Sequence, residues 1–359
     1  MFKNLIKKLS TEFDKNKYFI FIKLCIVIMA FLIAFLLTSI CITAAGANPF
    51  EVFISIIKGA FGSPERMTEI LVKATPLIFA GLGIAIAFKG GFWNIGAEGQ
   101  IYLGAIAATI VGVKINLSPF ILIPAVIISG FLAGGLWALI PGLLKVRFGI
   151  NEIILTMMMN YIAIHTASYI SHGPFRDPDG SLPQTAELFK GACLPVIINK
   201  TRLHAGILLA IFLCLLCYLI FKKTLLGYKI KAVGANPRSA FYGGINVFNT
   251  MIITIFISGG LAGLAGMGEV CGIHYRLLDG ISPGYGYTAI VVALLARLHA
   301  LWILLAAVLF ASLDIGAGFM QRTTGIPSSI VCIIEALIVI CILGSEILER
   351  KLMRKKVEK

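Results

Sequence analysis

Long runs of apolar residues, separated by short polar segments, recur along almost the whole chain. A helix needs about 20 consecutive, mostly apolar residues to cross the hydrocarbon core of a bilayer. The pattern predicts ten spans, at residues 24–45, 70–88, 92–112, 119–140, 153–171, 205–221, 249–271, 284–296, 301–320 and 329–344. The eighth is short, which is typical of a broken or tilted element, and eight spans with two re-entrant segments fit the same pattern. The predicted fold class is an all-α polytopic membrane protein.

The composition supports this prediction and limits the number of domains. The chain is 58% hydrophobic and only 13% charged, whereas about a quarter of the residues in soluble domains are charged. No long hydrophilic stretch interrupts the apolar runs. The sequence therefore predicts a single membrane domain over residues 1–359 and no separate catalytic domain.

The formal net charge of +14 could indicate nucleic-acid binding, but the positions of the basic residues favour another explanation. Lys and Arg lie mainly in the tails and at the ends of the spans, as the positive-inside rule requires. With both termini in the cytoplasm, about two thirds of the 31 basic residues fall on the inner side. This orientation predicts cytoplasmic tails at 1–23 and 345–359, an extracytoplasmic loop at 172–203 and a cytoplasmic loop at 222–248.

Residues 90–100 place several polar side chains and four glycines between two apolar runs. The polar or amphipathic members are Trp93, Asn94, Glu98 and Gln100. A carboxylate at membrane depth is costly and usually faces a cavity or a partner. Irregular backbone is tolerated there only where it is buried in protein or lines a water-filled path. The segment predicts a broken helix beside a translocation route, with a structural capping role for Glu98 as the alternative.

A second glycine-rich break, at 280–287, also precedes an apolar span. Paired breaks of this kind indicate two repeats with a substrate site between them. Amide and aromatic side chains near the breaks suit a polar ligand that contains a ring, because pockets combine apolar contact with a few placed hydrogen bonds. The candidate path residues are Trp93, Asn94, Glu98, Gln100, Asn160, Tyr161, Tyr285 and Tyr287. Each tyrosine taken singly fits an interfacial or packing role equally well.

The cytoplasmic loop 222–248 contains a helix-start signal at Asn236-Pro237, since Asn caps well and Pro fits the first turn. Small residues follow at Ala240, Gly243 and Gly244, and basic residues lie nearby at Lys231 and Arg238. These features predict a short helix that docks into a groove on another protein. A basic loop that only enforces topology is the alternative.

The sequence offers no catalytic or metal site. It lacks the Gly-x-x-x-x-Gly-Lys-Ser/Thr phosphate loop, and no His or Cys cluster has metal-ligand spacing. His172 and His204 bracket the outer loop and are predicted to be solvated. Three further intramembrane acids, Glu269, Asp314 and Glu335, fit either a proton relay or interhelical hydrogen bonds. No nucleophile–base arrangement is present, so the chain is predicted not to be an enzyme. It is also predicted to bind no cofactor.

Several motifs carry a resemblance to a known family. Residues 92–100 resemble the Asn-Ile-Gly-Ala-Glu-Gly-Gln signature of bacterial ABC-importer permeases for nucleosides and simple sugars, which are branched-chain amino acid/ribose-type membrane subunits. Further matching segments lie, in the family's order, at 149–154, 160–162, 232–237, 284–290 and 325–329. The nucleoside branch fits best. The acids at 314 and 335 depart from its pattern, so a simple-sugar permease stays an alternative.

The resemblance implies a permease subunit that performs no chemistry of its own. A separate ATPase chain would use ATP, a second permease subunit would complete the path, and an extracytoplasmic lipoprotein would deliver the nucleoside or sugar. The residues that would couple to the ATPase are Gly234, Asn236, Pro237, Arg238, Ala240 and Gly244. The implied location is the bacterial cytoplasmic membrane, with both termini cytoplasmic and no nucleic acid as partner. An ion-coupled carrier that uses Glu98, Asp314 and Glu335 is the remaining alternative.

Overall fold

The structure is a computed structural model that describes residues 29, 32–44, 46–178, 180 and 182–357. The predicted tail 1–23 lies outside the described residues, as does the start of the first predicted span. The described residues form helices and only isolated β-bridges, so the predicted all-α class is confirmed.

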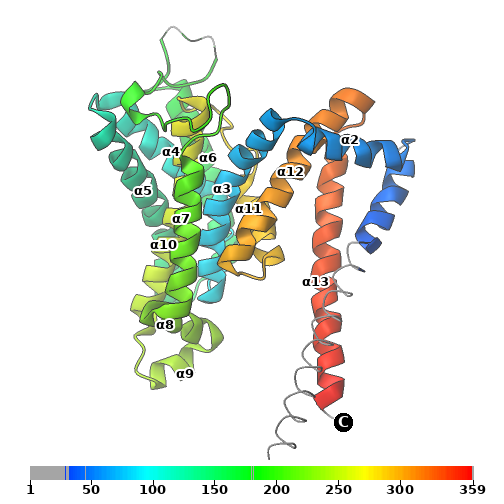
Figure 1. Cartoon of the computed structure of the whole chain (residues 1–359). Helices are drawn as coiled ribbons and strands as arrows, with labels where there is room; N and C mark the ends of the chain where they lie inside the picture. Colours follow the sequence, from blue (N-terminus) through cyan, green and yellow to red (C-terminus); the bar gives the residue numbers. More distant parts are fainter. Residues whose placement is uncertain (1–28, 30–31, 45, 179, 181, 358–359) are drawn as a thin grey trace, which may run out of the picture. The chain divides into compact units, whose positions relative to one another are not determined.

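The helices in chain order are Leu32–Ala44, α2 (Pro49–Phe61), α3 (Pro64–Lys89), α4 (Ala97–Lys114), α5 (Pro119–Phe148), α6 (Glu152–His172), the short η1 (Lys190–Ala192), α7 (Gly206–Lys223), α8 (Leu225–Ala235), α9 (Pro237–Tyr242), α10 (Val247–Glu269), the π-helical turn η2 (Val270–His274), α11 (Tyr285–Leu295), α12 (Ala300–Thr324) and α13 (Ser329–Val357). Figure 1 labels most of them along the chain.

Six of the described helices are long and apolar enough to cross a membrane, namely α3, α5, α6, α7, α10 with η2, and α12. A helix pair bent by 113°, Leu32–Ala44 with α2, would add a seventh span. α4 and α11 do not pass this test, because the breaks shorten their apolar parts, and the apolar segment Ser329–Ile342 of α13 is shorter than the test requires. α4 starts with the polar run at 97–100, and α11 has 11 residues, about 16 Å at 1.5 Å per residue. The polytopic prediction is confirmed, with six or seven full-length spans among the described residues.

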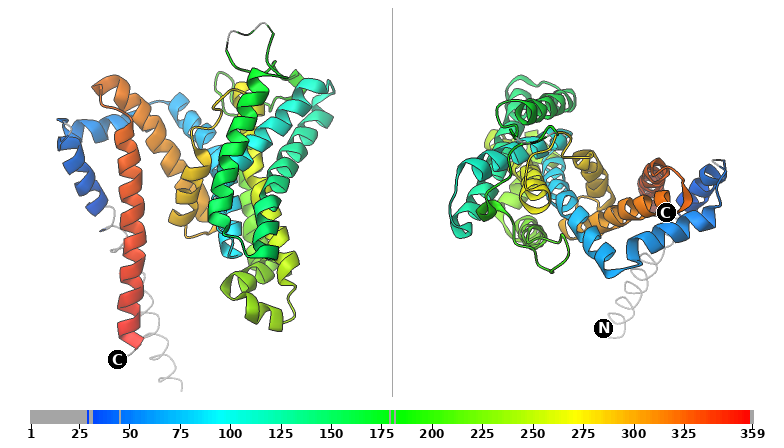
Figure 2. Two further views of the ribbon diagram at one scale, coloured as in Figure 1. Left: turned by 180° about the vertical axis from the view of Figure 1, so that it is seen from behind. Right: turned by 90° about the horizontal axis from the view of Figure 1, so that it is seen from above.

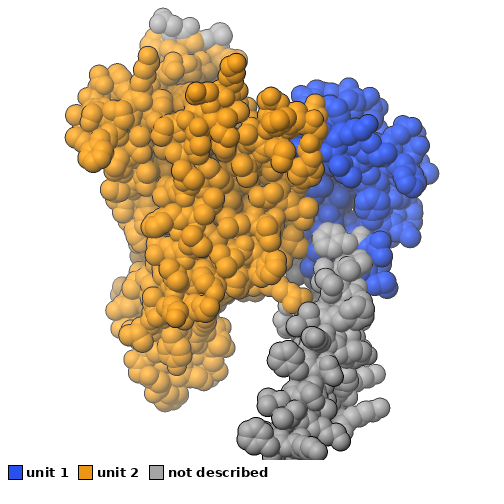
Figure 3. Space-filling view, in the orientation of Figure 1, with its two compact units in different colours: residues 1–60, 313–359 blue, residues 61–312 orange. Residues whose placement is uncertain are grey.

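The chain divides into two compact units, with the boundary inside α12, and Figure 3 colours them separately. Unit 1 contains residues 1–60 and 313–359. Within it, Gly316 allows close packing, because a Cβ there would lie 2.6 Å from the carbonyl oxygen of Ile56. Asp314, which is exposed, and Glu335, which is half-buried, belong to this unit.

Unit 2, residues 61–312, is a helical bundle organised around α10. α10 packs against α3, α4 and α5, and the views of Figures 1 and 2 show it inside the bundle. Its contact surface is made of small residues: a Cβ on Gly104 would lie 2.1 Å from the Gly263 carbonyl oxygen, and a Cβ on Gly134 would lie 2.3 Å from that of Gly259. Helices in membranes associate through such close packing, since lipid supplies no hydrophobic drive between them.

The two ends of unit 2 differ. α8 and α9 lie at one end of the bundle, and the loop between α6 and α7 lies at the other (Figure 1). Backbone hydrogen bonds fix this loop over the end of α10: Leu188 N donates to Tyr275 O at 2.8 Å and Leu194 N to Cys271 O at 2.8 Å. The part of the loop around 188–194 therefore covers this end of the bundle.

The prediction that His204 is solvated is wrong, because its side chain is 1% exposed. Its Nδ1 accepts a hydrogen bond from Gly206 N at 3.1 Å. The imidazole packs against Gly272, where a Cβ would lie 2.6 Å from the ring. Burial lowers the pKa of His204 to about 4, so the ring is neutral at physiological pH. His172, by contrast, is exposed as predicted.

The close approach of α4 and α10 generates a stability prediction. Gly104→Ala places a methyl group 2.1 Å from the Gly263 carbonyl oxygen, and overpacking of this kind costs about 1–3 kcal/mol. We expect a lower thermal midpoint for the purified protein, measured by size-exclusion chromatography after heating. Gly318→Ala is the matched control, because nothing lies within 4 Å of a Cβ at that helical glycine. Equal midpoints for the two variants would contradict the packing described here.

Candidate functional site

The break predicted at residues 90–100 is present, since α3 ends at Lys89 and α4 starts at Ala97. Gly91 has a φ of 78°, a left-handed conformation that glycine adopts without strain. Two amide side chains close the turn: Asn94 Nδ2 donates to Gln100 Oε1 at 2.9 Å, and Gln100 Nε2 donates to Asn94 Oδ1 at 3.0 Å. Asn94 Nδ2 also donates to Ser258 Oγ at 3.0 Å, which joins the turn to α10.

Asn160 of α6 satisfies backbone groups that the break leaves open. Its Oδ1 accepts from Gly99 N at 2.8 Å, and its Nδ2 donates to Ile95 O at 3.0 Å and to the Tyr287 hydroxyl at 3.2 Å. The residue is fully buried. A buried polar group is costly unless it is paired, so this amide fixes α6 and α11 against the start of α4.

Glu98 connects the first glycine-rich break to the second. Its Oε2 accepts from Gly286 N at 2.7 Å, and it also accepts from the Ser282 hydroxyl and the Gly284 N–H. These groups lie at the N-terminus of α11, where unpaired N–H groups and the helix dipole favour an anion. Gly286 makes the approach possible, because a Cβ there would lie 2.3 Å from Glu98 N.

We call the buried residues Asn94, Glu98, Gln100 and Asn160 the polar junction. Each is at most 2% exposed, and together they join the two breaks. The predicted aromatic path residues divide into two groups. Trp93, Tyr161 and Tyr287 are 51%, 55% and 41% exposed. Tyr285 is 7% exposed and lines a separate cavity.

An ion pair that carries no sequence motif supports the first break. Lys145 near the end of α5 pairs with Glu152 at the start of α6. The same ammonium group donates to Gly91 O at 3.2 Å, and Glu152 Oε1 accepts from Trp93 N at 3.4 Å. The pair therefore holds the backbone of the break from the other side. Only the position of both residues at predicted span ends could have suggested it.

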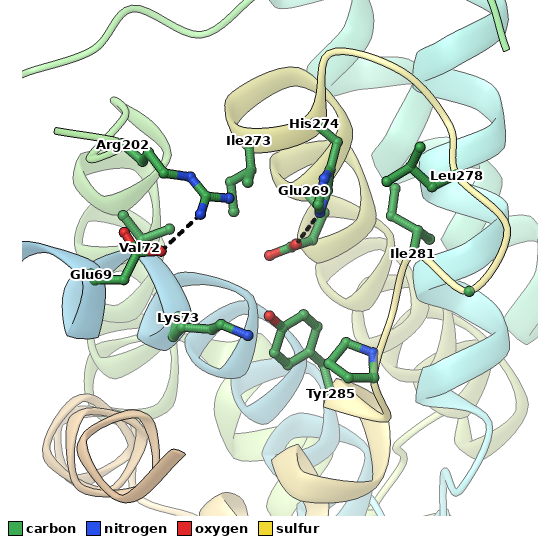
Figure 4. A pocket seen from close by; sticks show the side chains of 12 residues that line it. Glu69, Val72, Lys73, Arg202, Glu269, Ile273, His274, Leu278, Ile281 and Tyr285 are labelled. Atoms are coloured by element: carbon green, nitrogen blue, oxygen red, sulfur yellow. Dashed lines mark hydrogen bonds and ion pairs between the residues drawn. The ribbon is translucent and has the colours of Figure 1, made fainter. Parts of the chain in front are cut away.

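A cavity of about 270 Å³ lies beside the loop between α6 and α7 (Figure 4). Its polar and aromatic lining residues are Glu69, Lys73, Arg202, Glu269, His274 and Tyr285. The Arg202–Glu69 ion pair, at 3.1 Å, and a contact of 3.6 Å between His274 Nε2 and Glu269 Oε2 lie along the lining. Four separate segments of unit 2 contribute to the lining, so no single sequence motif predicts the cavity. Glu269 and Tyr285 were the only ones of these residues that the sequence marked.

The helix-start signal at Asn236-Pro237 is confirmed. The Asn236 side chain accepts from Arg238 N at 3.0 Å and Ser239 N at 3.1 Å, and α9 begins at Pro237. Phe241 and Tyr242 are 68% and 88% exposed, although the sequence did not mark them. With Pro237, Arg238 and Val247 they line an open hollow of about 420 Å³.

Two of the predicted coupling residues face the chain itself. Ala240 is buried with Val233 and Ile245. Gly234 lies against the end of α3, where a Cβ would be 1.9 Å from Lys89 O. Gly244 has a φ of 79° and open space around it. The large exposed side chains of α9 are therefore those of Arg238, Phe241 and Tyr242.

No group of three or more His, Cys, Asp or Glu residues that could hold a metal ion occurs in the part of the chain that the structure describes. The seven described cysteines are free thiols.

Comparison with known proteins gives a consistent result. Residues 66–343 match the family described as "Branched-chain amino acid transport system / permease component". The chain is 37% identical over 297 residues to the guanosine ABC transporter permease protein NupP of Bacillus subtilis, covering 82% of this chain and 85% of the relative. It is 33% identical over 346 residues to the nucleoside ABC transporter permease protein NupB of Lactococcus lactis, covering 93% and 94%. It is also 33% identical over 333 residues to the glucose ABC transporter permease protein TsgB13 of Haloferax volcanii, covering 90% and 88%.

The role of Glu98 in joining the breaks can be tested by substitution. Glu98→Ala leaves Gly286 N and its neighbouring donors without an acceptor, at a cost of about 1–3 kcal/mol for each buried group. Glu98→Gln keeps a carbonyl oxygen and should lose less. We expect the thermal midpoint to fall in the order wild type, Gln, Ala. Glu65→Ala, at an exposed carboxylate of α3, is the control. A Glu98→Ala midpoint as high as that of this control would show that the junction does not need the carboxylate.

Proposed function

This chain belongs to the family of permease components of branched-chain amino acid transport systems, and we propose that it is the membrane subunit of an ABC importer for nucleosides. The observation that carries the substrate class is the similarity to NupP and NupB, whose names specify guanosine and nucleosides. Transport of a simple sugar is the alternative, supported by the similarity to TsgB13.

The proposed importer divides its tasks among chains. This chain binds no ATP, in keeping with a sequence that has no phosphate loop. A separate ATPase supplies the energy, a second permease subunit completes the path, and an extracytoplasmic lipoprotein delivers the substrate. ATP binding shifts the assembly between outward- and inward-facing states through contacts that differ between those states. The chain lies in a bacterial cytoplasmic membrane with both termini inside, as the distribution of basic residues favours.

We propose that α9 is the docking element for the ATPase. Its exposed residues Arg238, Phe241 and Tyr242 surround an open hollow, and aromatic and Arg side chains are the types that dominate binding energy at interfaces. α9 also lies at the end of the bundle opposite the loop between α6 and α7 (Figure 1). Gly234 and Ala240 pack against other parts of the chain and hold α9 in place.

We further propose that the polar junction borders the substrate path as its supporting wall. Asn94, Glu98, Gln100 and Asn160 are buried and hydrogen-bonded, so they support the wall of the path. The exposed side chains of Trp93, Tyr161 and Tyr287 face the substrate. The Tyr287 hydroxyl links the two layers through its hydrogen bond to Asn160. Aromatic rings over a few fixed polar groups are typical of small-molecule sites.

Uptake by intact cells tests the substrate class. Cells that express this chain with its partner subunits should accumulate tritiated guanosine, adenosine and uridine, and cells lacking only this chain should not. Labelled glucose and ribose serve as the comparison in the same cells. Accumulation of a sugar without any nucleoside would establish the alternative.

Docking through α9 is tested by Tyr242→Ala, which removes the most exposed ring of the hollow. Truncating an aromatic hot spot costs about 2 kcal/mol or more, roughly a 30-fold loss of affinity. We expect less ATPase to copurify and substrate-stimulated ATP hydrolysis to fall with it, at unchanged expression. Tyr169→Ala is the matched control, since this tyrosine is 69% exposed and lies near the C-terminal end of α6, outside α9. Undiminished copurification with Tyr242→Ala and Phe241→Ala combined would assign α9 a purely topological role.

A further inference from the structure

The cavity beside the loop between α6 and α7 contains an unsatisfied acceptor. Oε1 of Glu269 is buried and has no hydrogen-bond partner among the described residues, and the residue is 3% exposed. Its other oxygen, Oε2, lies 3.6 Å from His274 Nε2. Figure 4 shows the carboxyl group pointing into the cavity. Buried polar atoms are nearly always paired, so a lone buried acceptor that faces a cavity indicates a partner that enters from outside.

The local backbone explains why Glu269 and His274 share this cavity. Residues five apart lie roughly 140° apart around an ideal α-helix, which has 3.6 residues per turn. The π-helical turn η2 follows Glu269 directly and widens the coil, so both side chains face the same space. Tyr275 closes the turn with a φ of 56°, a conformation that is uncommon outside glycine. Single π-helical turns occur frequently at functional sites.

The charges around the cavity limit the kind of ligand. Glu69 pairs with Arg202 at 3.1 Å, and the Lys73 ammonium lies 5.5 Å from the centre of the Tyr285 ring. The formal charges of the two carboxylates, Glu69 and Glu269, are thus matched by those of Lys73 and Arg202. An anion would meet the open acceptor Oε1 of Glu269, and a cation would meet Lys73 and Arg202. A neutral ligand can donate a hydrogen bond to Oε1 of Glu269 without placing a net charge beside the carboxylates or the cations.

We infer that this cavity is a ligand subsite for a neutral ring compound rich in hydroxyl or N–H donors, held through Glu269 Oε1. The inference rests on the proposed function and deepens it: the ribose hydroxyls or base N–H groups of a nucleoside are donors of this kind. The volume of about 270 Å³ is close to the lower end of ligand pockets, so the site accepts one small compound or part of a larger one. A nucleotide is excluded, because its phosphate would add negative charge beside the open carboxylate oxygen of Glu269.

Direct binding provides the test. The membrane assembly that contains the full chain is purified in lipid nanodiscs without the extracytoplasmic lipoprotein, and binding of tritiated guanosine is measured. Glu269→Leu should weaken binding about 10-fold or more, since a hydrogen bond to a charged group contributes that much. Glu269→Gln keeps an acceptor oxygen and should lose less. Glu65→Leu, at an exposed carboxylate of the same helix as Glu69, should bind as the wild type does.

A second measurement leaves Glu269 intact. Leu278 lines the cavity, so a thiol at Leu278→Cys should react with maleimide more slowly when guanosine is bound, as mass spectrometry of the labelled peptide would show. Cys193, in the loop between α6 and α7 and outside the lining, is the internal control. Guanosine 5′-monophosphate should neither protect this thiol nor compete with guanosine.

The outcomes separate the inference from the function on which it rests. Unchanged guanosine affinity in Glu269→Leu, no protection of the thiol at 278, or equal competition by the monophosphate would each overturn the subsite. If cells still accumulate nucleosides in that case, only the subsite is wrong. If the complete importer accumulates no nucleoside, the proposed function itself fails.

Discussion

The hydrogen bond from Gly286 N to Glu98 is the interaction on which the arrangement of unit 2 depends. It joins residues 188 positions apart and brings the two glycine-rich breaks together. A carboxylate inside a helical bundle is expensive unless several donors surround it. The N-terminus of α11 supplies these donors as backbone groups that no residue within the helix can use. Each break therefore satisfies the other, and neither is stable at membrane depth alone.

The other three residues of the polar junction also pair with groups at the first break. Breaking a helix leaves N–H and C=O groups that lipid cannot satisfy. Asn94 and Asn160 supply partners for backbone groups at 95, 96 and 99, and Gln100 pairs with the Asn94 amide. The cost of irregular backbone is thus offset by amides that come from α4, α6 and the turn itself.

Small residues provide the second constraint. Gly104, Gly134 and Gly263 let α4, α5 and α10 approach to backbone contact, so the bundle transmits a displacement of one helix directly to the next. α8 packs against α3, α7 and α10, and Gly234 brings it onto the end of α3. A force applied at α9 would therefore reach the polar junction through packed backbone rather than through flexible side chains. α8 and the end of α3 thus connect α9 to the polar junction through close backbone packing.

The sequence by itself determined what depends on local chemistry. Apolar runs of spanning length identified a polytopic membrane protein, glycine clusters located both breaks, and Asn236-Pro237 located the start of α9, because each signal acts within a few residues. The tertiary structure decided everything that depends on which segments meet. Glu98 finds Gly286, and the cavity around Glu269 combines α3, a loop, η2 and α11. His204 is buried because Gly272 leaves room for its ring. Contacts of this kind rest on long-range packing, and a pattern along one chain does not specify the partner of a residue.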